Sequence, residues 1–209
     1  MIRWAVLAVV LLGVFVALGL LVSTQPLALD RTIADALQGQ WQRPAGTVAT
    51  VVSDVLGPVL PAVFGSVLLI AAALSWRPDQ VRAMVLLRVI VVLALCRLTS
   101  LVFKPLFERA RPRQYADLSY PSGHVVSTAS TGVAAVLLCL WLAPKLLRRV
   151  AVVSAVATVL CAASRLVLGV HWLTDTVGAV LAVLGIGILA ALAVRLLPAA
   201  RVPAGREPA

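Results

Sequence analysis

Residues 4–22 read WAVLAVVLLGVFVALGLLV, a run without a single charged side chain. As an α-helix this run would extend about 28 Å at ~1.5 Å per residue, close to the ~30 Å hydrocarbon thickness of a bilayer. It is too long for the apolar core of a signal peptide, ~7–15 residues, and no A-x-A cleavage motif follows it directly. We therefore predict a membrane-spanning helix.

The rest of the chain has the same apolar character. Of its 209 residues, 62% are hydrophobic and 12% are charged, whereas a soluble domain is about half apolar and a quarter charged. This composition excludes a soluble enzyme, a disordered chain and a fibrous protein. At ~20 residues per span the length allows about six helices, so we predict an all-α integral membrane bundle. The predicted spans are residues 4–22, 47–74, 83–103, 123–142, 150–163 (continuing to 170) and 174–197.

The formal charge of +10 comes from 18 Lys and Arg against 8 Asp and Glu. No basic run with interleaved aromatics indicates a nucleic-acid partner. Six spans place both termini on one side of the membrane. With Lys104, Arg111 and Arg165 set aside as site residues, the remaining cations are in excess on that side, which favours cytoplasmic termini. We predict one domain, residues 1–197, and a disordered cytoplasmic tail, residues 198–209.

Residues 23–46 are polar for this chain and show a four-residue apolar repeat. The spacing fits a short amphipathic helix on the membrane surface, and it fits an ordinary loop equally well. The apolar positions are Leu29, Ile33, Leu37 and Trp41, and the polar positions are Asp30, Arg31, Asp35 and Gln38.

The second span contains Gly57, Pro58 and Pro61, which predict a kink. Asp54, near its outer end, is expected to be a buried or interfacial carboxylate, with either a functional or a structural role. Within the third span, two charged side chains, Arg88 and Arg97, should snorkel or face a polar interior. The last span carries a stripe of small residues that allows another helix to approach closely; the stripe is Gly178, Ala182 and Gly185.

The two histidines of the chain, His124 and His171, lie at the ends of apolar spans on one predicted side of the membrane. Lys104, Arg111 and Arg165 belong to that same side. Such a polar cluster is costly at a membrane face unless it has a partner. Because the cations outnumber the nearby carboxylates, we infer that the partner is an anionic group of a substrate.

Residues 121–124, Pro-Ser-Gly-His, come where a loop becomes a predicted helix, and a helix N-terminus favours anions. Ser122 could cap the helix or donate its hydroxyl to an anion, and Gly123 would let the anion approach the backbone. Farther along, His171 and Asp175 are four residues apart and would share a helix face. The carboxylate could hold one ring N–H and leave the other nitrogen as a nucleophile or base, or the two could form a structural pair.

Two histidines and an aspartate could also bind a metal, but three neighbouring cations oppose a divalent ion, so we predict no metal. An anion held by fixed cations beside an oriented imidazole suits metal-free phosphoryl transfer.

Three ordered motifs contain these residues: K-x6-R-P at 104–112, P-S-G-H at 121–124 and S-R-x5-H-x3-D at 164–175. Together they resemble the type 2 phosphatidic acid phosphatase (PAP2) superfamily of membrane lipid phosphatases. Gln114 departs from a second Arg-Pro pair that many relatives have, outside the core motif. The resemblance implies that His171 is the nucleophile, Asp175 orients it, His124 is the acid and then the base, and Lys104, Arg111, Arg165, Ser122 and Gly123 hold the phosphate.

The resemblance further implies a lipid phosphatase without metal or cofactor, in the plasma membrane, with its site on the extracytoplasmic side and the bilayer and a lipid phosphate as partners. Among the substrates of bacterial relatives, we favour a polyprenyl (undecaprenyl-type) diphosphate, followed by phosphatidylglycerophosphate or phosphatidate. A lipid-phosphate transporter or binding protein is the alternative of another class, but a simple anion binder needs neither His124 nor the His171–Asp175 pair. Nothing in the sequence indicates an oligomeric state.

Overall fold

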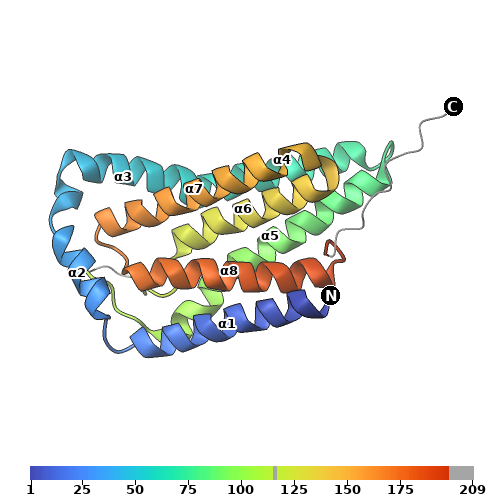
Figure 1. Ribbon diagram of the computed structural model, residues 1–209. Coiled ribbons are helices and arrows are strands. Elements are labelled where there is room, and N and C mark those ends of the chain that lie inside the picture. The colour runs from blue at the N-terminus through green and yellow to red at the C-terminus, as the bar shows by residue number, and fades with distance from the viewer. Residues whose placement is uncertain (115–116, 198–209) are drawn as a thin grey trace.

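The computed structural model describes residues 1–114 and 117–197, and these fold into a bundle of long helices (Figure 1). Six helical segments of the described chain are long and apolar enough to cross a membrane, which confirms the predicted all-α membrane bundle. The tail predicted at 198–209 lies outside the described residues. The six segments are Ile2–Val22, Pro44–Ser75, Gln80–Phe107, Gly123–Leu142, Pro144–Val167 and Leu173–Ala193.

The α-helices follow one another with short connections. A five-residue π-helical segment, η2 (Val55–Val59), joins α3 to α4 within the second span. Short 3₁₀ turns, η1 (Gln40–Gln42) and η3 (Pro144–Leu146), precede α3 and α7. The α-helices are α1 (Ile2–Val22), α2 (Ala28–Ala36), α3 (Pro44–Asp54), α4 (Leu60–Ser75), α5 (Gln80–Phe107), α6 (Gly123–Leu142), α7 (Leu147–Val167) and α8 (Leu173–Ala193).

Helix α6 lies at the centre of the bundle, in contact with α4, α5, α7 and α8, while α1 packs along α8. In Figure 1 the start of α1 and the end of α8 lie at one end of the bundle. Helix α2 and the starts of α6 and α8 lie at the opposite end. Helices satisfy their own backbone hydrogen bonds, which is why apolar runs of this length can be buried in lipid as helices.

The helix boundaries differ from the predicted spans mainly in α5. The predicted span ends at residue 103, but the helix continues through Pro105 to Phe107, so Lys104 lies in its last turn. A proline so close to a helix end removes one backbone hydrogen bond without stopping the helix. Glu108 then ends α5 with a left-handed backbone (φ 45°). Helix α6 has the predicted bounds, α7 begins before residue 150 and ends at Val167, and α8 ends at Ala193.

The segment whose spacing fits either an amphipathic helix or a loop contains the helix α2, but this helix does not have the orientation that the apolar repeat implies. Asp30, expected on the outward polar face, is 1% exposed, and Leu29, expected on the apolar face, is 57% exposed. The reason is a buried ion pair between Asp30 and Arg109, which a local hydrophobic pattern cannot reveal. Asp54 ends α3 on the exposed surface of the protein, so it is not a buried carboxylate.

The glycine-proline segment of the second span forms the π-helical turn η2, and Thr128 of α6 donates a hydrogen bond to the Leu56 carbonyl there (2.8 Å). The small-residue stripe of α8 also has close neighbours. A Cβ on Gly178 would lie 2.3 Å from the Tyr120 ring, and one on Gly185 would lie 2.7 Å from Leu12 of α1. The stripe therefore lets α1 and the loop before α6 approach α8.

Candidate active site

A cavity of about 260 Å³ opens at the end of the bundle where α6 begins and α5 and α7 end. It brings together most of the predicted site residues, although they are far apart in the sequence. Ser122 and Asp175 lie outside the lining. The lining residues are Pro58, Arg97, Ser100, Lys104, Arg111, Asp117, Gly123, His124, Ser127, Arg165 and His171.

His171 lies in the loop before α8 and is 3% exposed. Its Nδ1 is 3.2 Å from Asp175 Oδ2, and its Nε2 is 3.3 Å from Arg111 Nη1. Because a guanidinium only donates hydrogen bonds, Nε2 must be the acceptor and Nδ1–H the donor to the carboxylate. Burial lowers the pKa of His171 to about 4, against the opposing effect of Asp175. The imidazole is therefore neutral at physiological pH and carries its lone pair on Nε2.

The expectation that His171 and Asp175 share a helix face is wrong in its local geometry, because α8 begins only at Leu173. The pair forms through the helix start instead. The Asp175 side chain turns back to accept a hydrogen bond from the Trp172 backbone N–H (2.8 Å), and the same oxygen faces His171. A helix N-terminus favours an anion at this position.

Asp175 is completely buried and has two further polar partners that the sequence analysis missed. The Ser119 hydroxyl donates to Oδ2, and Arg109 Nη1 donates to Oδ1. Arg109 is 2% exposed and also pairs with Asp30 of α2 through Nη2 (2.8 Å). Arg109 could have been predicted as a site residue from its position within the K-x6-R-P motif, two residues before Arg111. Nothing in the local sequence indicates a site role for Asp30.

Lys104 and Arg111 share one carboxylate, that of Asp117. Arg111 also donates to the backbone carbonyls of Asp117, Val170 and Leu118 at 2.6–3.1 Å, which fixes its guanidinium. Burial alone would raise the pKa of Asp117, but the hydrogen bond and charge of Lys104 and the charge of Arg111 lower it. The ionised Asp117 carboxylate thus forms ion pairs with two of the cations predicted to bind phosphate.

The second span supplies part of the cavity wall, which the sequence analysis did not anticipate. Ser53 of α3, fully buried, accepts a hydrogen bond from Arg165 Nη1 (2.8 Å) in the last turn of α7. A Cβ on Gly57 would lie 2.3 Å from His124 Cδ2, so the imidazole packs directly against the backbone of η2. Arg97 of α5, predicted to need a polar surrounding, lines the cavity.

Ser122 is the N-cap residue of α6, but its side chain makes no capping hydrogen bond. Its buried Oγ has no hydrogen-bond partner among residues 1–114 and 117–197. Gly123, the first residue of α6, lines the cavity, and a Cβ there would meet only Ser100, at 3.6 Å. The backbone at the start of α6 is therefore open to a ligand in the cavity.

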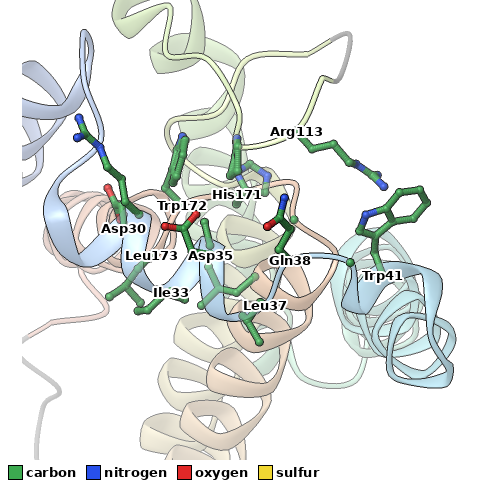
Figure 2. Close-up of a pocket in the computed structure, with 16 residues that line it drawn as sticks. Asp30, Ile33, Asp35, Leu37, Gln38, Trp41, Arg113, His171, Trp172 and Leu173 are labelled. Carbon is green, nitrogen blue, oxygen red and sulfur yellow. The ribbon is translucent and has the colours of Figure 1, made fainter.

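A second pocket, of about 370 Å³, lies between α2 and the loop joining α7 to α8 (Figure 2). It shares His171 with the first cavity, and Trp172 also lines it. On its outer side the Arg113 guanidinium lies 4.2 Å from the centre of the Trp41 ring. Within the part of the chain that the structure describes, no group of three or more His, Cys, Asp or Glu is arranged to hold a metal ion.

The fold and the cavity that contains His124 and His171 define a multi-pass membrane protein with a cationic, histidine-containing site at one end of its helices. Residues 85–201 match the sequence model of the PAP2 superfamily, which is over half of the chain, and the chain belongs to this family of membrane lipid phosphatases.

The chain is also similar to a solved structure described as a transmembrane PAP2-type phosphatidylglycerolphosphate phosphatase from Bacillus subtilis. The two are 25% identical, the alignment covers 88% of this chain and 93% of that one, and the TM-score is 0.65. No curated protein matches the chain. These findings confirm the predicted family and its six-helix fold.

Proposed function

We propose that this lipid phosphatase works through a phosphohistidine formed on His171. The observation that carries the proposal is the geometry of the His171 imidazole, which has Asp175 at Nδ1 and directs Nε2 at Arg111 of the cavity. Nε2 would attack phosphorus, and the bond from phosphorus to the leaving oxygen would break. His124, on the wall of the same cavity, would donate its proton to that oxygen.

In the second step His124 would take a proton from water, and the resulting hydroxide would attack phosphorus. The P–N bond would break, releasing inorganic phosphate and restoring neutral His171. Lys104, Arg111 and Arg165 would stabilise the charge that spreads over the equatorial oxygens of the transition state. Ser122 and the Gly123 backbone would add donors at the start of α6.

For the substrate, we propose a polyprenyl (undecaprenyl-type) diphosphate, because a small six-span enzyme with an outward-facing site suits the recycling of a carrier lipid. The solved structure described as a phosphatidylglycerolphosphate phosphatase favours that lipid as the second candidate, with phosphatidate alongside it. We further propose that residues 1–197 form one domain in the plasma membrane with the site on the extracytoplasmic side, supported by the excess of cations on the side of the termini.

Purified protein in liposomes should release phosphate from lipid phosphates in the presence of excess chelator. We expect the highest kcat/KM for polyprenyl diphosphate in a panel that also contains phosphatidylglycerophosphate and phosphatidate. A higher value for either of the other lipids would reassign the substrate. Loss of activity with chelator, restored by a divalent metal, would contradict the metal-free mechanism. Phosphate binding without hydrolysis of any of these lipids would instead indicate a binding protein or transporter.

Replacing Asp117 with asparagine should tighten phosphate binding. A bound phosphate would compete with the Asp117 carboxylate for Lys104 and Arg111. A neutral amide at position 117 would compete less well for these cations. We expect the inhibition constant of inorganic phosphate to fall roughly 3- to 10-fold, or about 0.6–1.4 kcal/mol. Glu108→Gln is the matched control, because this exposed carboxylate in the same loop should leave the constant unchanged. An unchanged or weaker constant in Asp117→Asn would contradict the competition.

Replacing Gly57 with alanine should reduce turnover without unfolding the protein. The added methyl group would overlap the His124 ring, so the imidazole must move away from its present position. A misplaced acid should lower kcat on the order of 10- to 100-fold. Gly65→Ala on the same span is the control, because its Cβ would meet only Leu93, at 3.7 Å. Equal kcat values for the two variants and wild type would show that His124 does not need this contact.

A further inference from the structure

We propose that Asp30 and Arg109 are positioning residues that hold Asp175 in place and preserve its negative charge for His171. The effect expected on turnover rests on the proposed function. Arg109 is 2% exposed and places one guanidinium between two carboxylates. Nη1 binds Asp175 Oδ1, and Nη2 binds Asp30 Oδ2 at 2.8 Å. Both carboxylates are completely buried, so water does not weaken either ion pair.

Asp30 also joins α2 to the first turn of α8. Its Oδ1 accepts a hydrogen bond from the Thr174 backbone N–H (3.0 Å), and its Oδ2 accepts one from the Thr174 hydroxyl (2.7 Å). The Thr174 oxygen in turn accepts a hydrogen bond from Arg109 Nη1 (2.7 Å). A carboxylate from the N-terminal part of the chain thus caps the helix whose first turn carries Asp175.

The charges of this group explain why two carboxylates are needed. Positive charge develops on the His171 ring as its Nε2 bonds to phosphorus, and Asp175 stabilises that charge through Nδ1–H. Arg109 alone would offset the charge of Asp175, since it lies on the opposite side of the same carboxylate. The second carboxylate, Asp30, balances Arg109, so Arg109 can orient Asp175 while the negative charge of Asp175 remains available to the imidazole.

Removing Arg109 would create a different defect. Asp30 and Asp175 would then be two buried carboxylates facing the same space without their shared cation, which favours proton uptake by one of them. A protonated or rotated Asp175 could not hold the His171 N–H as it does now. Asp30 lies in α2, outside residues 85–201, the part matched to the family. Helix α2 would therefore contribute a positioning residue to the site.

The test combines kinetics with the NMR signal of one histidine. The chain has two histidines, so a His124→Gln background leaves only the His171 ring. In ¹⁵N-histidine-labelled protein, the Nδ1 proton reports its hydrogen bond to Asp175 without any need for turnover. We expect Asp30→Asn to move this proton resonance upfield. In the otherwise unmodified chain, Asp30→Asn should lower kcat about 10- to 100-fold and leave KM within about twofold.

Asp35→Asn is the matched control, because Asp35 lies on the same helix and is exposed (Figure 2); it should change neither readout. Arg109→Lys is the second variant. It keeps the charge but loses the planar group that bridges two carboxylates, so it should also lower kcat and move the resonance. If Asp30→Asn does not fold, Arg109→Lys carries the test.

An unmoved Nδ1 proton in folded Asp30→Asn or Arg109→Lys would overturn the proposal. A moved resonance with wild-type kcat would support the positioning of Asp175 but contradict the nucleophilic role of His171. The test therefore distinguishes an error about Asp30 and Arg109 from an error about His171.

Discussion

Replacing His171 with alanine should lower kcat for lipid phosphate hydrolysis by ~10⁴-fold or more, the size of effect seen when a catalytic nucleophile is lost. The variant removes the only group proposed to bond to phosphorus. It leaves Lys104, Arg111 and Arg165 in the cavity, and Arg111 keeps its bonds to the Val170 and Leu118 carbonyls. Phosphate release from liposomes measures the loss.

The same variant contains its own control. Because the cations remain, His171→Ala should still bind inorganic phosphate, with a dissociation constant within roughly threefold of that of wild type. Preserved binding would show that the cavity is intact and that the defect is chemical. Turnover close to the wild-type rate would remove His171 from the reaction and would require a different attacking group.

Replacing Asp175 with asparagine should lower kcat on the order of 10²- to 10⁴-fold with little change in KM. Asp175 Oδ2 accepts hydrogen bonds from the Trp172 N–H and the Ser119 hydroxyl and faces His171 Nδ1. An amide has one accepting oxygen in place of two, so it cannot serve both Arg109 and this set of donors. The imidazole would lose the partner that keeps its proton on Nδ1, which in a serine protease triad costs ~10⁴ in rate.

Asp54→Asn is the matched control for this change. Asp54 is exposed at the end of α3, so its replacement should leave both kinetic constants unchanged. Nearly normal turnover in Asp175→Asn would mean that the His171–Asp175 contact is structural, which is the alternative that the sequence left open.

The membrane fold was predictable because hydropathy is a local property of the chain. Most of the apolar runs are long enough to indicate a span by themselves, and α6 has the predicted bounds. The end of α5 was not predictable in this way. A proline such as Pro105 indicates a helix boundary in the sequence, yet α5 continues through it to Phe107. The orientation of α2 was also beyond the local pattern, since Asp30 faces inward to meet a side chain 79 residues away.

The candidate site was predictable where residues carry chemistry in ordered motifs. Charge and spacing indicate Lys104, Arg111, His124, Arg165 and His171, and the fold gathers them around one cavity. Their supporting residues have no such signature. Ser53 and Gly57 contact Arg165 and His124, and these contacts exist only after the second span packs against α6 and α7.

The most direct test of the central claim is to trap the enzyme during turnover of a lipid labelled with ³²P in the phosphate that is released. Rapid quenching in alkali and peptide mapping should find a phosphoryl group on His171 that is stable to alkali and labile to acid, and that is absent from His171→Ala. A phosphoryl group on another residue, or steady turnover with no labelled protein at any quench time, would contradict the account.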